Sequence, residues 1–152
     1  MYKTIELKAL TDNYASLSEW LEGIIASFGI SGKLANKINV CSEEIFVNIA
    51  SYAYPEETGQ VKVLLSKEGN EIILKFEDEG FEYNPLQKED PDITLSYDKR
   101  PIGGLGIFMV KEMSKNVEYE RKNNKNILTI TFNTDNDKRH MQYDIIEKRG
   151  IL

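Results

Sequence analysis

A carboxylate and an amide stand four residues apart in the segment Ser31–Tyr54, which reads SGKLANKINVCSEEIFVNIASYAY. Apolar residues recur there at steps of three and four, the period of an amphipathic helix: Leu34, Ile38, Cys41, Ile45, Ile49 and Tyr52. In such a helix Glu44 and Asn48 project about 40° apart, one turn above the other, at the edge of the apolar stripe. A carboxylate there can accept a proton, and an amide oxygen suits a hard cation.

Helix geometry separates Glu44 from its neighbour Glu43. Val40 and Val47 lie just beyond the Glu44–Asn48 pair, so apolar residues bracket the pair on both sides. Glu43 projects roughly opposite the stripe, and we expect it in water. The pair could also simply mark the border between core and solvent, as polar residues on helix faces usually do.

A second carboxylate, Asp78, is expected at the end of a strand in the stretch KFEDEGFEYNPL. A carboxylate at such a position can accept a hydrogen bond from an exocyclic amine. Gly80 follows two residues later, and a glycine permits an unusual backbone angle and the close approach of a planar ring. Taken alone, the D-x-G pattern is also typical of an ordinary turn.

Glycines gather at the start of an expected helix in Gly103-Gly104-Leu105-Gly106-Ile107-Phe108. Backbone N–H groups exposed there, with the positive end of the helix dipole, favour a phosphate. The pattern lacks the Gly-Lys-Ser/Thr of a Walker loop, and a long loop rather than a strand precedes it, unlike a dinucleotide fingerprint. A glycine-rich hinge is the alternative interpretation.

The bulk composition excludes several classes of protein. The 152 residues are 41% hydrophobic and 29% charged, which is ordinary for a globular protein. The net charge is −6, and no basic stripe is present that could neutralise the phosphates of a nucleic acid. No apolar run approaches the roughly 20 residues of a membrane span, and the N-terminus has no signal-peptide pattern, so we expect a cytoplasmic protein. The single cysteine, Cys41, is on the apolar stripe, and the one histidine, His140, is in a polar tail. A Cys/His catalytic pair or zinc site is therefore excluded.

Periodicity and turn signals predict the order of the elements. Helix N-caps are available at Thr11, Asp12 and Asn13, a left-handed C-cap at Gly29, and a further N-cap at Ser31. The expected helices are one containing Leu17 to Phe28, the central segment Ser31–Tyr54, and Leu105–Met113. The expected strands are Met1–Lys8, Val61–Ser66, Glu71–Asp78, Val117–Arg121 and Ile127–Phe132, with turns at Pro55–Gly59, Lys67–Asn70 and Lys122–Asn126.

This order predicts an α+β fold, a two-layer α/β sandwich with a mixed, mainly antiparallel sheet and helices on one face. Lys62, Lys75, Glu118 and Glu120 alternate with apolar residues, as expected of a sheet with one wet face. We assign residues 1–133 to one domain and 134–152 to a charged tail whose role cannot be read. The stretch Gly80–Gly104 is too long for a passive connection, which favours a functional loop.

Together the three motifs form a known set. E-x-x-x-N on a helix, D-x-G after a strand, a long loop and G-x-G opening a helix resemble the GHKL ATPase superfamily. The short chain and the phrase GGLGIFMVKEMSKNVEYER look most like the anti-sigma-factor serine kinases within it. The resemblance implies the Bergerat ATP-binding fold, with ATP between the helices and beneath a lid formed by the long loop.

The resemblance also implies a role for each matching residue. Asn48 would coordinate Mg²⁺ on the ATP phosphates, Glu44 would act as general base, and Asp78 would hold the adenine amino group. Gly80 would make room for the base. The phosphates would be held by Gly104 and Gly106 and by the N–H groups around Leu105 and Ile107.

Three positions depart from the pattern of many relatives. Tyr52 stands where many have a histidine, and Phe81-Glu82 follows Gly80 without a second glycine. Asn126 replaces a frequent threonine at the start of the last strand, which leaves the second adenine contact open.

The resulting hypothesis is an ATP- and Mg²⁺-dependent serine kinase that phosphorylates a small anti-sigma-factor antagonist and sequesters a sigma factor. The first rival is a nucleotide-gated binding module that captures a partner without phosphorylating it. A histidine-kinase catalytic piece is disfavoured because no phosphoacceptor helix is present. The oligomeric state, a homodimer included, and the identity of the partners cannot be read from the sequence.

Overall fold

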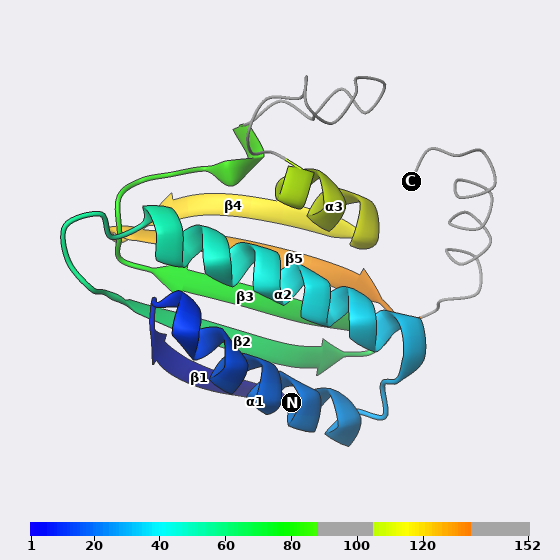
Figure 1. Cartoon of the computed structure of the whole chain (residues 1–152). Coiled ribbons are helices and arrows are strands. Elements are labelled where there is room, and N and C mark those ends of the chain that lie inside the picture. The colour runs from blue at the N-terminus through cyan, green and yellow to red at the C-terminus, as the bar shows by residue number, and fades with distance from the viewer. Residues whose placement is uncertain (88–104, 135–152) are drawn as a thin grey trace, which may run out of the picture.

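The computed structural model of the chain describes residues 1–87 and 105–134 (Figure 1). Five strands run antiparallel in one sheet in the order β1-β2-β3-β5-β4, so β1 and β4 form its edges. The elements are β1 (Tyr2–Lys8), η1 (Thr11–Asn13), α1 (Tyr14–Ser27), α2 (Gly32–Tyr52), β2 (Gln60–Glu68), β3 (Glu71–Asp78), η2 (Pro85–Gln87), α3 (Leu105–Met113), β4 (Asn116–Lys122) and β5 (Lys125–Asn133).

The three α-helices cover one face of the sheet, and α2 runs along the strands over the middle of the sheet (Figure 1). This is the predicted two-layer α+β sandwich. The mainly antiparallel character expected of the sheet is confirmed, and all four pairings between described strands are antiparallel. The tail, apart from Thr134, and residues 88–104 of the long loop lie outside the described residues.

Strict alternation of burial explains why the strands form and which face they turn to the helices. In β3 every second residue from Ile72 to Asp78 is buried, and in β5 every second residue from Asn126 to Phe132. The other face is polar as predicted, because Lys62, Glu118 and Glu120 are exposed there. Burying one apolar face of the sheet beneath the helices is the main favourable contribution to this packing.

The central helix α2 contributes the largest helical share of the core. Its stripe is buried at Leu34, Ile38, Cys41 and Ile45, as the sequence predicted. Ser42 and Phe46 are fully buried as well, because α1 covers a second side of the helix. Tyr52, predicted on the stripe, is instead 58% exposed, because it lies in the last turn of the helix.

Cys41 is a buried hydrophobe, as predicted. Burial is the largest cause that raises the pKa of its thiol to about 12, and the nearby Glu44 carboxylate adds to this. A thiol held neutral in this way is a poor nucleophile.

The first helix differs from the prediction at its start and agrees with it at its end. A 3₁₀ turn, η1, occupies Thr11–Asn13, and the cap position Asn13 makes no side-chain bond to the helix. Its amide instead donates to the carbonyl of Lys8. Ser31 caps α2 without a side-chain bond as well. At the end of α1, Gly29 has φ of +76°. The N–H of Ile30 donates to the carbonyl of Ile25, which completes a Schellman motif.

The hairpin between β4 and β5 is tighter than predicted. We expected a turn over Lys122–Asn126, but β4 extends to Lys122 and β5 begins at Lys125. Asn123 and Asn124 form the two-residue turn with φ of +53° and +60°, the left-handed pair of a type I′ turn. Asn126 therefore lies inside β5, opposite Asp78 of β3, rather than in a turn.

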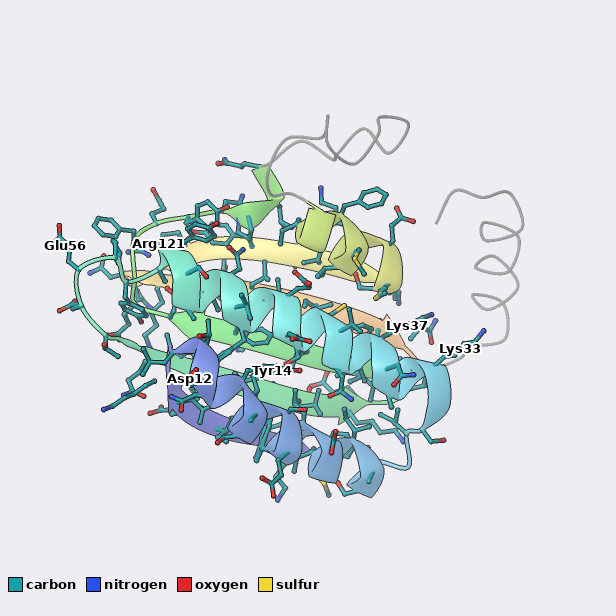
Figure 2. All side chains as sticks on the ribbon, in the orientation of Figure 1. Asp12, Tyr14, Lys33, Lys37, Glu56 and Arg121 are labelled. Carbon is teal, nitrogen blue, oxygen red and sulfur yellow. The ribbon has the colours of Figure 1, made fainter. Side chains whose placement is uncertain are left out.

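Tyr14 joins the two long helices by a hydrogen bond and a ring contact. The Tyr14 hydroxyl of α1 donates to the carbonyl of Asn39 in α2 at 3.1 Å, and its ring lies 6.1 Å from that of Phe46. Figure 2 shows Tyr14 between the two helices, with Lys33 and Lys37 at the start of α2 and Arg121 beyond its other end.

Within the described ranges, the helices are too short or too polar to cross a membrane.

Two glycines of this region should respond to alanine with opposite signs. Gly29→Ala is expected to destabilise the protein by about 1 kcal/mol, because an L-residue is strained at positive φ. Gly23→Ala, in the exposed middle of α1 with open space around it, is expected to stabilise it by about 0.5–1 kcal/mol. Urea unfolding followed by Trp20 fluorescence measures both, and shifts of equal sign would contradict the assignment of the two conformations.

Candidate functional site

A cavity, partly open to solvent, lies between the end of α2 and the sheet. Its wall combines apolar residues with a few convergent polar groups, the usual make-up of a ligand site. It is lined by Ile45, Asn48, Ile49, Tyr52 and Ala53 of the α2 region, by Phe76 and Asp78 of β3, by Tyr83 and Pro85, and by Tyr119, Asn126 and Leu128 of β4 and β5.

Asp78 is the carboxylate in this cavity, and only 5% of the residue is exposed. The backbone N–H of Gly80 and the side-chain amide of Asn126 each donate to its Oδ1 at 2.9 Å. Burial raises the pKa of Asp78, and the two hydrogen bonds, with the nearby charge of Arg121, offset part of this effect. Within the described part of the chain, Oδ2 is the oxygen left for a ligand.

Asn126 uses its whole amide in bonds to the protein. Its Nδ2 donates to Asp78 and to the carbonyl of Phe81 at 2.6 Å. Its Oδ1 accepts from the N–H of Tyr83 at 3.2 Å and from the hydroxyl of Tyr119 at 2.5 Å. The side chain thus joins β3, β4 and the segment after β3 at one point.

Gly80 lies against the end of α2. A Cβ added to it would overlap the carbonyl oxygen of Ala53 and lie 2.7 Å from its carbon. The next residue, Phe81, donates its N–H to that same carbonyl at 3.0 Å, and Arg121 Nη1 donates to the carbonyl of Gly80 at 2.8 Å. A close approach of backbone to backbone therefore requires a glycine here. The glycine is therefore needed for packing against Ala53, which is a different reason from the room for a nucleotide base that the resemblance implies.

Two tyrosines form part of the rim of the cavity. Tyr52 of α2 and Tyr83 after β3 lie with their ring centroids 6.1 Å apart at an interplanar angle of 37°. Tyr52 is the residue that departs from the histidine of many relatives, and it lines the cavity while 58% of it is exposed. Asn48 lies half-buried one turn earlier and lines the same cavity.

Glu44 lies against the first turn of α3. A Cβ added to Gly106 would overlap Glu44 Oε2 and lie 3.0 Å from Cδ, so the glycine makes room for the carboxylate. Glu44 is half-buried and Glu43 is exposed, as helix geometry predicted. Burial, with a smaller contribution from Glu43, raises the pKa of Glu44. The candidate base and the expected phosphate-binding helix thus meet in the fold.

The other glycine-rich positions are described in part. α3 begins at Leu105, and Ile107 is buried in the core with 7% of its surface exposed. Gly104 lies outside the described residues. Among the residues that the structure does describe, no group of three or more His, Cys, Asp or Glu could hold a metal ion.

The order of these groups along α2 gives the site a direction. Glu44 lies at α3, Asn48 follows one turn later, and Ala53 meets the loop after Asp78. At a rise of 1.5 Å per residue the nine steps from Glu44 to Ala53 span about 13 Å. An elongated ligand could therefore place an anionic end at α3 and a planar end at Asp78.

Comparison with known proteins identifies the family of this domain. The histidine kinase-like ATPase domain family matches residues 7–132, nearly the whole described chain. The chain belongs to this family. The predicted membership in the GHKL superfamily is therefore confirmed, and ATP is the ligand that the family implies.

Named relatives fall in the predicted branch of the family. The serine/threonine-protein kinase BtrW of Bordetella bronchiseptica is 28% identical over 129 residues, covering 84% of this chain and 91% of that protein. The serine-protein kinase RsbW of Bacillus thuringiensis is 21% identical over 123 residues, and that of Bacillus anthracis 23%, each covering 77% of both chains.

The sequence motifs predicted three polar residues of the candidate site but not the residues that hold them. The fold of this ATPase domain places Asn48 and Asp78 in the wall of one cavity and Glu44 beside the start of α3, and their roles stay predictions. They did not predict that Tyr83 and Tyr119 join Asn126 in a hydrogen-bond network. The one available signal was that an amide replaces a hydroxyl at position 126.

The buried Asp78 carboxylate predicts a pH-dependent effect of Asp78→Asn. Between the unfolded pKa of about 3.9 and the raised folded pKa, the folded protein binds more protons than the unfolded chain, so its stability falls as pH rises. The amide removes this loss and still accepts from Asn126. Urea unfolding at pH 4.5 and 7.5 should therefore show a gain on the order of 1 kcal/mol that grows with pH. A difference independent of pH would contradict the burial of the charge.

Proposed function

We propose that this protein binds ATP with Mg²⁺ and transfers the γ-phosphoryl group to a serine of a small antagonist protein, as an anti-sigma-type regulatory kinase. Membership in the ATPase family supports nucleotide binding. The names of the relatives BtrW and RsbW support a serine kinase over other family activities. The sequestered partner would be a sigma factor, in keeping with the anti-sigma resemblance.

The observation that carries the kinase proposal is the contact between Glu44 and Gly106. A half-buried carboxylate lies directly beside the start of a nine-residue helix, where backbone N–H groups favour phosphate. A serine hydroxyl that approaches the phosphate end of a nucleotide would therefore meet Glu44. The carboxylate would accept the hydroxyl proton while the oxygen attacks phosphorus.

At the other end of the cavity, Asp78 would read the base. Its Oδ2 can accept a hydrogen bond from the amino group of adenine, whereas the carbonyl of guanine would be repelled. The apolar residues Ile45, Ile49 and Leu128 of the cavity wall would contact the faces of the ring. ATP and ADP should then bind in preference to GTP.

Asn48 fits a magnesium site of the kind that nucleotides form. Mg²⁺ keeps several waters and takes few protein ligands besides phosphate oxygens, so one amide oxygen on the cavity wall is enough. When bound, the ion would neutralise charge on the phosphates. The N–H groups of Gly106 and Ile107, with those of Gly104 and Leu105, would hold the phosphates in place.

Phosphorylation of a candidate antagonist tests the proposed function directly. The protein is incubated with Mg-ATP and a small antagonist protein, and phosphoserine is sought by mass spectrometry. Calorimetric titration with ADP runs alongside it. ADP binding without phosphoserine would favour the nucleotide-gated binding module instead, and absence of ADP binding would overturn both.

Three variants of α2 separate the proposed roles. Glu44→Ala should leave ATP affinity about unchanged but lower phosphoryl transfer by roughly 10²–10⁴, the usual reach of general base catalysis. Asn48→Ala should weaken Mg²⁺-dependent nucleotide binding because a metal ligand is lost. Glu43→Ala is the matched control, since the exposed Glu43 adjoins Glu44, and it should cost at most about 0.5 kcal/mol of stability. If Glu44→Ala transfers phosphate like the wild type, Glu44 is not the base.

Gly106→Ala should impair transfer without unfolding the protein. The added methyl group overlaps only the end of the flexible Glu44 side chain, which can rotate away. A shift of the base by about 1 Å can cost up to about 10²-fold in rate, so we expect at least a tenfold loss. Phosphotransfer assays and thermal melts measure the two effects, with Gly23→Ala as control. Unchanged transfer would contradict the proposed place of Glu44 in the reaction.

A further inference from the structure

We propose that Asn126 is a positioning residue for base recognition, whose amide holds Asp78 so that one carboxylate oxygen faces the amino group of a 6-aminopurine. This inference rests on the proposed nucleotide-binding function. It adds the residue that sets the selectivity of the site, and it explains the amide found where many relatives have a threonine.

The β3–β5 pairing places Asn126 directly opposite Asp78. Both residues are at least 94% buried, with exposures of 6% and 5%, so neither can exchange its partner for bulk water. Asn126 Nδ2 and Gly80 N–H both bond to Oδ1 of Asp78. A carboxylate held by two donors on one oxygen has one orientation, with its other oxygen available to a ligand in the cavity.

The remaining contacts of Asn126 fix which way its amide points. Its oxygen accepts from the N–H of Tyr83 and the hydroxyl of Tyr119, and its nitrogen also donates to the carbonyl of Phe81. If the amide were flipped, its nitrogen would face the N–H of Tyr83, so two donors would meet. Its oxygen would then face the oxygens of Asp78 and Phe81, which are both acceptors. A hydroxyl has a single proton, so serine or threonine could not donate to both Asp78 and Phe81.

The amide also acts on the charge of Asp78. A hydrogen bond donated to a carboxylate favours its ionised form and opposes the effect of burial, which raises the pKa. An ionised carboxylate only accepts hydrogen bonds, so it distinguishes the amino group of adenine from the carbonyl of hypoxanthine. A protonated carboxyl group could donate to that carbonyl and would lose the distinction.

The ratio of the IDP and ADP dissociation constants tests this role. The two nucleotides share ribose and phosphates, so general weakening of the site cancels in the ratio. One charge-assisted hydrogen bond corresponds to about 10- to 100-fold preference for ADP in the wild type. Asn126→Asp keeps the shape, removes both amide donors and places a second carboxylate against Asp78, which favours a protonated carboxyl group there. Calorimetric titration should then show the ratio reduced at least fivefold.

Asn126→Ala is a second test variant in case Asn126→Asp fails to fold, as judged by circular dichroism. We expect the same reduction in the ratio of the IDP and ADP dissociation constants. The matched control is Asn116→Ala, because Asn116 also donates an amide hydrogen bond to a carboxylate, that of Glu118, on the exposed part of β4. Its ratio should equal that of the wild type.

The outcomes separate this inference from the proposed function. If the Asn126 variants bind both nucleotides more weakly at an unchanged ratio, Asn126 is only structural and the inference is overturned. If the wild type does not prefer ADP to IDP, Asp78 does not read the amino group, and the inference is overturned as well. If the wild type binds neither nucleotide, the proposed function itself fails.

Discussion

Burial of the Asp78 carboxylate is the constraint around which this end of the fold is arranged. A charge taken out of water must be compensated by hydrogen bonds, because each unpaired buried group costs free energy. The compensation comes from Gly80 within the same segment and from Asn126 on the neighbouring strand. Asn126 must then be held in turn, and its other partners belong to β4 and to the chain after β3. One buried charge thereby fixes β3, β4, β5 and the segment after β3 relative to one another.

The same end of the molecule depends on how closely α2 approaches. Ala53 contacts the backbone at Gly80, and Glu44 contacts the start of α3 at Gly106, in each case where a Cβ would overlap the helix. Two glycines of the nucleotide-binding motifs thus also provide the contacts between α2 and its neighbours. The sequence pattern alone does not tell whether a glycine is there to approach a ligand or to pack against the central helix, because both roles require a residue without a side chain.

Most of the fold followed from hydrophobic period, because burial on one face dictates a repeat of two in strands and of 3.6 in helices. The misses lie where a tertiary contact overrode that signal. Phe46 and Ser42 are buried because α1 covers a second side of α2, which a single stripe does not reveal. The β4–β5 turn is a local miss of another kind. Its expected length, up to Asn126, reflects the Asn-rich run, whereas two left-handed residues, Asn123 and Asn124, complete the turn alone.

For the candidate site, the sequence was informative where a polar residue type is unusual for its position. A carboxylate at a strand end, or at the edge of an apolar helix stripe four residues before an asparagine, stands out, so Asp78 and Glu44 could be proposed from the sequence. An asparagine and two tyrosines do not, and Asn126 is 48 residues from Asp78 along the chain. Their bonds exist only because the β3–β5 register brings them together. Because Asn126 and Gly80 both donate to Oδ1 of Asp78, its Oδ2 is left as an acceptor for a base at this end of the described cavity.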